Sequence, residues 1–96
     1  MAVKIHIKRK IKQSALKEVH AMLIRARKNA MVCKGYISTE TLVDVNDPSR
    51  IMVVSMWQRK EDWDNYANSA ARRKNEKNFE EILEAATEYE IYKMGM

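Results

Sequence analysis

The run IMVVSMW at residues 51–57 is the feature that most constrains the fold of this chain. Its side chains alternate between two faces, with Met52, Val54 and Met56 on one and Ile51, Val53 and Trp57 on the other. A strand that is apolar on both faces is typical of the centre of a sheet that is covered on both sides. We therefore expect helices against one face and a second copy of the chain, laying its own sheet against the other.

The spacing of apolar residues predicts the remaining elements. Alternation predicts strands over 3–11, 36–45 and 87–94, and apolar residues three or four apart predict helices over 15–30, 60–67 and 69–86. Ser14 and Ser69 are the expected N-caps, and the NDP turn at 46–48 makes the second and third strands a hairpin. The order βαββαβ predicts a ferredoxin-like α+β fold with a four-stranded antiparallel sheet, as one domain spanning 1–96.

The composition of the chain limits the kinds of site and partner that it can have. Cys33 is the only cysteine, so a disulfide is excluded, and His6 and His20 are too far apart to suggest a metal site. No run approaches the roughly 18 apolar residues of a membrane span, so we expect a cytoplasmic protein without a membrane partner. Nucleic-acid binding is suggested only by the basic charge: the net charge is +5, and basic residues cluster at 8–12, 25–28 and 72–74. Without an RNP-like motif or a zinc finger, we expect no nucleic-acid partner.

Four segments, taken in order, resemble the antibiotic biosynthesis monooxygenase (ABM) domain. They are GYISTETL (35–42), NDP (46–48), VSMWQRKEDW (54–63) and TEYEIY (87–92). The resemblance implies a dimeric α+β barrel in which two ferredoxin-like sheets close face to face. It also implies one of several activities: cofactor-independent oxidation of anthrones or quinols, haem degradation, or handling of small signalling molecules without oxygen chemistry.

The resemblance carries over to individual residues only in part. Trp57 and Trp63 match the spacing of two aromatic positions in the anthrone-type enzymes, but Val53 stands where those enzymes have an Asn. Tyr66 and Glu76 stand where the haem-degrading members have a Trp and a His. The missing histidine argues against haem degradation, and no cofactor is expected.

Each candidate site residue has a structural alternative. Trp57 and Trp63 either pack the core or wall a pocket for a flat aromatic ring, and Tyr66, on the same helical face as Trp63, either packs or presents its hydroxyl to a cavity. His6 is a candidate base if its face of the first strand is the barrel interior, and it has no role if that face meets solvent. Weaker candidates for polar contacts with a substrate are Tyr36, Ser38 and Ser55.

Two functions remain open. The first is a monooxygenase acting on a quinol or anthrone, with His6 as base and with Trp57 and Trp63 orienting the ring. The second is a non-catalytic dimer of the same fold that binds a small molecule. The apolar Val53 and the carboxylate of Glu76, at positions where catalytic relatives carry other groups, favour this second hypothesis.

Overall fold

The computed structural model describes residues 1–95 and contains the predicted elements in the predicted order. The strands are β1 (Val3–Lys10), β2 (Tyr36–Val43), β3 (Arg50–Trp57) and β4 (Glu88–Lys93). The helices are η1 (Gln13–Ala15, a 3-10 turn), α1 (Leu16–Met31), α2 (Lys60–Ala67) and α3 (Ala70–Glu80). The bounds of α2 are those predicted from the sequence, and the other elements differ from expectation mainly at their ends.

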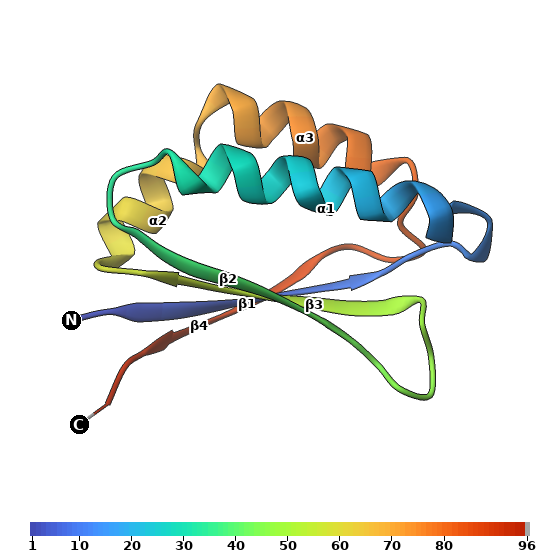
Figure 1. The fold of residues 1–96 in the computed structure, drawn as a ribbon, viewed down its shortest axis with the longest axis horizontal. Helices are drawn as coiled ribbons and strands as arrows, with labels where there is room; N and C mark the ends of the chain where they lie inside the picture. The colour runs from blue at the N-terminus through green and yellow to red at the C-terminus, as the bar shows by residue number, and fades with distance from the viewer. Residues whose placement is uncertain (96) are drawn as a thin grey trace.

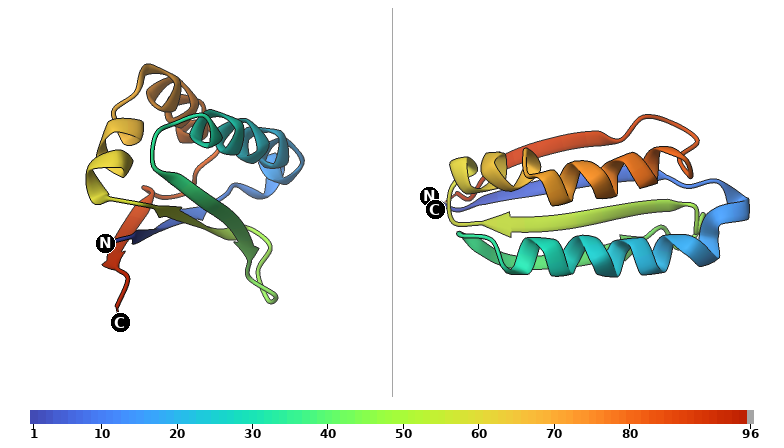
Figure 2. Two further views of the ribbon diagram at one scale, coloured as in Figure 1. Left: turned by 60° about the vertical axis from the view of Figure 1, so that its left-hand side comes forward. Right: turned by 90° about the horizontal axis from the view of Figure 1, so that it is seen from above.

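The four strands form one antiparallel sheet in the order β2-β3-β1-β4, which confirms the ferredoxin-like α+β prediction. The helices all lie on one face of the sheet, and within residues 1–95 no element covers the opposite face (Figure 1). Seen from above, α1 runs along the β2 side of the sheet and α3 lies beside it (Figure 2). The chain therefore has a closed layer between helices and sheet, and an open face beneath.

Alternation along β1 and β3 separates these two faces. Val3, Ile5 and Ile7 are buried under the helices, as is Trp57, which has no exposed surface. On the open face lies a row of partly exposed residues from both strands: Lys4, His6, Lys8, Met52, Val54 and Met56. The apolar open side of β3, which led us to expect a second copy, is thus left uncovered within one chain.

The helix ends agree with the sequence in one case and differ in another. Ser69 caps α3 as predicted, because its hydroxyl accepts a hydrogen bond from the backbone N–H of Arg72 at 3.2 Å. Ser14 is not the N-cap of α1, so that prediction was wrong. The chain instead turns through η1 first, and α1 begins after Ala15 without a side-chain cap.

The last helix is shorter than predicted. α3 ends at Glu80, and Leu83 forms an isolated bridge with Ile11 just beyond β1. The backbone N–H of Lys12 also bonds to the carbonyl of Ile82 at 2.8 Å. These contacts use the apolar residues after α3 to close the end of the sheet, where the periodicity had suggested another helical turn.

Two local irregularities set the faces of β2. Gly35 precedes the strand with φ of +84°, in the left-handed region that favours glycine, and Asp62 packs directly against it. A bulge between Tyr36 and Ser38 then shifts the register against β3. As a result Tyr36 lies on the helix side opposite Trp57, while Ser38 lies on the open face opposite Met56.

Candidate functional site

Four aromatic rings meet between the sheet and α2. Trp57, at the end of β3, stacks on Tyr66 with ring centroids 5.1 Å apart and planes 23° apart. Trp63 and Tyr36 contact Trp57 edge-on, with centroids at 6.2 and 5.7 Å. The Trp57 indole N–H donates to Ser55 Oγ at 2.7 Å, so the polar atom of this buried ring is satisfied within its own strand.

A charged triad of two buried arginines and the half-buried Glu76 lies beside these rings. Arg9 of β1 and Arg72 of α3 are each only 5% exposed. Arg9 donates a hydrogen bond to Oε1 of Glu76, and Arg72 forms an ion pair with the same oxygen at 3.1 Å. Arg72 also donates to the hydroxyl of Tyr89 at 3.0 Å, and the Arg9 guanidinium lies 4.0 Å from the centre of the Phe79 ring. Two guanidinium cations therefore share one carboxylate inside the helix–sheet layer.

A small cavity of about 30 Å³ opens against this triad, between α1 and the sheet. Its apolar walls come from β1, α1 and β3, and its polar atoms come from Ser55, two threonines of β2, Tyr66 and three arginines. The arginines are Arg9, Arg27 and Arg72. Within residues 1–95, none of the side chains that line this cavity is acidic.

Burial sets the protonation of the groups around this cavity. Desolvation lowers the pKa of Arg9, and the nearby carboxylate of Glu76 opposes that change; the guanidinium stays charged because its ordinary pKa is so high. Desolvation also raises the pKa of Tyr66. The Tyr66 hydroxyl is therefore protonated at neutral pH and donates to the carbonyl of Ala26 at 3.3 Å, so it can give a proton but is a poor base.

Two polar atoms at the cavity have no hydrogen-bond partner among residues 1–95. They are Nε of Arg9 and Oγ1 of Thr39, both fully shielded from solvent. Buried polar atoms in proteins are nearly always paired. Thr39 lies opposite Ser55 and Arg9 lies opposite Ile51, so these two atoms are in separate places at the cavity.

The structure brings together some of the predicted site residues. Val53, Ser55 and Tyr66 line the cavity. Trp57, Trp63 and Tyr36 form the aromatic packing behind it but are not part of its wall.

Two predicted residues lie elsewhere. Ser38 is on the open face, and so is His6, whose Nδ1 lies 3.3 Å from Glu90 and whose ring contacts that of Tyr92. The sheet separates His6 from the cavity, so the proposed base and the proposed ring-binding residues are not in one site.

The sequence interpretation missed Arg9 and Arg72 as site residues and had counted them only among the basic clusters at 8–12 and 72–74. Both are buried, and a signal for this was present. Arg9 continues the alternation of Val3, Ile5 and Ile7, and Arg72 lies seven residues before Phe79 on the buried side of α3. A charged residue in phase with an apolar stripe indicates a buried charge, whatever its neighbours in the sequence are.

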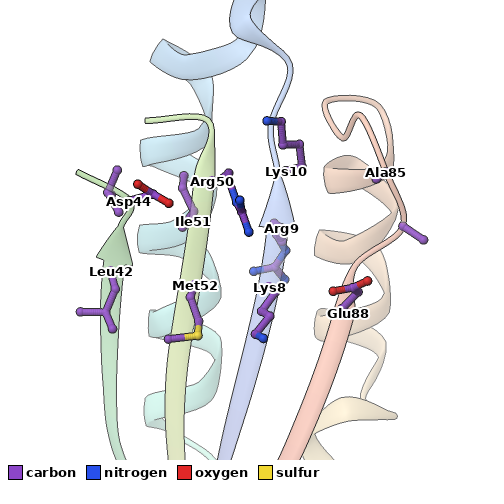
Figure 3. A pocket seen from close by; sticks show the side chains of 12 residues that line it. Lys8, Arg9, Lys10, Leu42, Asp44, Arg50, Ile51, Met52, Ala85 and Glu88 are labelled. Carbon is purple, nitrogen blue, oxygen red and sulfur yellow. The ribbon is translucent and has the colours of Figure 1, made fainter. Parts of the chain in front are cut away.

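A second hollow of about 510 Å³ lies on the open face, at the end of the sheet remote from Trp57 (Figure 3). Its cations are Lys8, Lys10, Arg50 and the buried Arg9, and three of the four already have acidic partners. Lys8 pairs with Glu90 at 3.1 Å, Lys10 with Asp47 at 2.8 Å, and Arg9 with Glu76. No aromatic side chain lines it. We place the candidate site in the smaller cavity, because two of its three cations are buried and because Tyr66, stacked on Trp57, forms part of its wall.

Other kinds of site are not seen in the described chain. Within residues 1–95 no group of three or more His, Cys, Asp or Glu side chains is arranged to hold a metal ion. In the same range, no helix combines the length and the apolar character needed to cross a membrane.

The sequence matches one protein family. Residues 2–78 match the family described as "Antibiotic biosynthesis monooxygenase". No curated protein matches the sequence.

Solved structures of similar fold are numerous. A conserved protein from Methanosarcina mazei Go1 superposes with a TM-score of 0.93 at 17% identity, over 99% of this chain and 94% of that one. Rv0793 from Mycobacterium tuberculosis gives 0.90 at 10% identity, over 100% and 97%. SnoaB, a cofactor-independent oxygenase from Streptomyces nogalater, gives 0.89 at 8% identity, over 99% and 94%. At these identities the likeness establishes the fold alone.

Proposed function

Because this chain belongs to the antibiotic biosynthesis monooxygenase family, we propose that it is a cofactor-independent monooxygenase acting on a small electron-rich aromatic of the quinol or anthrone type. One observation carries the proposal: a small cavity between α1 and the sheet is walled by Tyr66, whose ring stacks on that of Trp57 behind it. SnoaB, which has the same fold, is described as a cofactor-independent oxygenase. That likeness supports the reaction class, and the substrate is inferred from the site.

The reaction needs no electron source beyond the substrate. An anthrone that loses a proton from its methylene carbon becomes an electron-rich anion, which passes an electron to dioxygen. The two radicals combine into a peroxide at that carbon, and loss of water leaves a carbonyl, so that one methylene and one O2 give one C=O and one H2O. The protein's part is to orient the ring, stabilise charge and exclude bulk water.

The residues around the cavity divide these tasks. Trp57 fixes the plane of Tyr66, and the Tyr66 hydroxyl is a protonated donor at the cavity wall that can give a proton to the departing peroxide oxygen. Val53 contributes an apolar wall, and Ser55 holds the indole of Trp57. His6 lies across the sheet, so the proposal assigns it no role as base.

Entry for a substrate ring lies between α1 and β2. The cavity has room for the end group of a ligand and not for a fused ring system, so binding parts these elements. At this gap the Arg27 guanidinium donates to the carbonyl of Thr39 at 3.2 Å, in an exposed position. An exposed hydrogen bond contributes little net free energy to stability. Separating α1 from β2 at this bond therefore requires little free energy.

We also propose that the open sheet face is covered by a second copy. The central strand places Met52, Val54 and Met56 there, beside cations of β1 and acidic residues of β4. A two-fold arrangement lets the cationic row of one sheet face the acidic row of the other, while the methionines and valines meet between them. The homodimer therefore hides an apolar strip that one chain leaves uncovered.

A second candidate function is a binding protein of the same fold without turnover. The small volume of the cavity favours it, as does the absence, among its lining residues in the described chain, of a side chain that titrates near neutral pH. Such a protein would hold an aromatic ligand and leave it unchanged.

The deciding experiment is oxygen uptake by the purified protein with a panel of reduced quinones and anthrones, without added metal or flavin. The matched variants are Ala26→Leu, which fills the cavity, and Ala21→Leu on the exposed face of the same helix. We expect uptake above autoxidation in the wild-type protein and in Ala21→Leu, and loss of that uptake in Ala26→Leu.

Uptake that is equal in both variants would show that the reaction does not use this cavity. No uptake across the panel, together with thermal stabilisation by the same compounds under argon, would favour the binding protein.

A further inference from the structure

The excess positive charge of the chain lies on the outer side of the helix layer. The exposed cations of α1 are Lys17, Arg25, Arg27 and Lys28, and its one acidic residue is Glu18. The exposed cations of α3 are Arg73, Lys74 and Lys77, beside the exposed Glu80. Within residues 1–95 none of these cations forms an ion pair, whereas two lysines of the open sheet face pair with carboxylates. The helix layer therefore presents a basic surface to its surroundings.

Exposed apolar side chains lie among the cations of α1. Residues 17, 21, 24, 28 and 31 recur at spacings of four and three, so they share the side of the helix that faces away from its buried residues. On this side Ile24 is 45% exposed and Met31 is 56% exposed. Val32, at the C-terminal end of the helix, is 87% exposed, and Lys28 and Lys34 flank it in the sequence. The helix thus ends in an apolar corner surrounded by positive charge.

This combination distinguishes between two anionic partners. The phosphates of a nucleic acid would pair with the cations but would leave Met31 and Val32 without apolar contacts. An anionic lipid surface accepts both, because its headgroups attract the cations and the boundary of its acyl chains accepts apolar side chains. The two helices also lie side by side in one layer, so their outer sides can approach a flat surface together (Figure 2).

We propose that the outer face of α1, with the Met31–Val32 corner at its end, docks on a membrane whose headgroups are anionic. The cations lie at the headgroups, and the two apolar side chains reach the boundary of the acyl chains. The sequence led us to expect no membrane partner because it lacks a spanning run, but docking on the surface needs no such run. The docking surface does not depend on the proposed reaction.

The docking surface meets the candidate site at Arg27. This exposed residue lines the cavity, and its guanidinium bonds to the carbonyl of Thr39 at the gap between α1 and β2. A compound with an apolar ring partitions into lipid. If the proposed function holds, a quinol or anthrone therefore passes from the membrane into this gap without crossing bulk water.

The test is flotation of the purified full chain with lipid vesicles at about 0.1 M salt. One set of vesicles is phosphatidylcholine alone, and the other contains one third phosphatidylglycerol, which is anionic. We expect at least about tenfold tighter binding to the anionic vesicles. Arg25→Gln/Lys28→Gln should weaken that binding at least about tenfold, because each cation near an anionic leaflet contributes a factor of about five. Arg59→Gln/Lys93→Gln removes two exposed cations outside α1 and α3 and should change it less than about threefold.

A second pair of substitutions tests the apolar corner. Met31→Ser/Val32→Ser keeps every charge and should also weaken binding to the anionic vesicles at least about tenfold, since insertion would bury two apolar side chains. Both side chains are exposed, so the variant should fold, and circular dichroism checks this. A short DNA duplex at the same salt is the competing probe.

No binding to anionic vesicles, or equal binding by the two charge variants, would overturn the inference. Tighter binding of the duplex that Met31→Ser/Val32→Ser leaves unchanged would assign this face to nucleic acid instead. Vesicle binding that is insensitive to the same variant would also contradict docking through the corner. Docking without oxygen uptake would count against the monooxygenase and leave the docking surface standing, and uptake without docking would do the reverse.

Discussion

Trp57 and Ser55 form a closed pair on one strand: the indole N–H donates to the hydroxyl oxygen at 2.7 Å, and both residues are buried under the helices. Ser55→Ala leaves that N–H without an acceptor. We expect the free energy of unfolding to fall by about 1–3 kcal/mol, measured by urea denaturation. Ser14→Ala, at an exposed position in η1, is the control and should change it by less than about 0.5 kcal/mol. Equal effects of the two variants would contradict this role for Ser55.

Gly35 combines a left-handed backbone with a crowded position. An added Cβ would lie 2.1 Å from Oδ2 of the buried Asp62, at φ of +84°. Gly35→Ala should therefore destabilise the fold by more than about 2 kcal/mol, since strain and overpacking each cost about 1–3 kcal/mol. Gly95→Ala has no atom within 4 Å and serves as the matched substitution. Thermal unfolding of both measures the difference, and a Gly35→Ala protein as stable as Gly95→Ala would rule the argument out.

Asp47 gives the β2–β3 turn a defined response to acid. A hydrogen bond from Lys10, followed by those from Ser49, lowers its pKa from 3.8 to about 2. Because the folded pKa is depressed, its contribution to stability is complete above about pH 4 and is lost as the pH falls toward 2. Asp47→Asn should unfold at a lower temperature at pH 6, and this deficit should shrink between pH 4 and 2. A deficit that stays constant over that range would show that Asp47 acts through packing alone.

His6 and Arg72 show which side of the sheet the proposed reaction uses. His6 is separated from the cavity by the sheet, whereas Arg72 lines it. If the proposed reaction occurs, His6→Gln should leave kcat within about twofold, and Arg72→Met should lower kcat/KM by at least about tenfold, the effect of one lost charged hydrogen bond. Oxygen uptake measured over pH 6–9 checks both variants. A tenfold loss in His6→Gln with the dimer intact would restore histidine as the base.

Val54 tests the open face. It lies at the centre of β3 on the uncovered side, opposite His6. Val54→Glu should convert the expected homodimer to a monomer at micromolar concentration, because a buried carboxylate without a partner costs several kcal/mol. Ile24→Glu, on the exposed side of α1, introduces the same group away from that face and should leave the assembly unchanged. Sedimentation velocity separates these outcomes, and a wild-type protein that is monomeric at that concentration would remove the dimer proposal.

The order of the helices and strands could be predicted from the sequence, because the apolar residues of each element recur at helical or strand spacing. Helix α2 was predicted to the residue, since its apolar spacing and its flanks agree. The N-terminus of α1 was not, because η1 inserts a turn that no side-chain cap marks. Local patterns report local structure, and the 3-10 turn depends on contacts between the end of β1 and the segment after α3.

The candidate site was harder to predict, for two physical reasons. Arg9 and Arg72 are far apart in the sequence, and both pair with Glu76, a contact that neither position reveals by itself. The faces of the sheet were easier. Trp57 was placed correctly with Val53 and Ser55, whereas the side on which a cavity forms depends on how closely α1 approaches β2.

The bulge between Tyr36 and Ser38 has a consequence for any variant of this strand that differs in length. Strict alternation would place Tyr36 and Ser38 on the same side of the sheet, but here they point to opposite sides. The alternation of β2 therefore shifts by one residue near the start of the strand. Deleting Ile37 would restore a regular count, and one half of the strand would then present its inward side chains outward. The extra residue in the bulge therefore has a structural use. It lets this edge strand place the ring of Tyr36 against Trp57 under the helices and the hydroxyl of Ser38 on the open face.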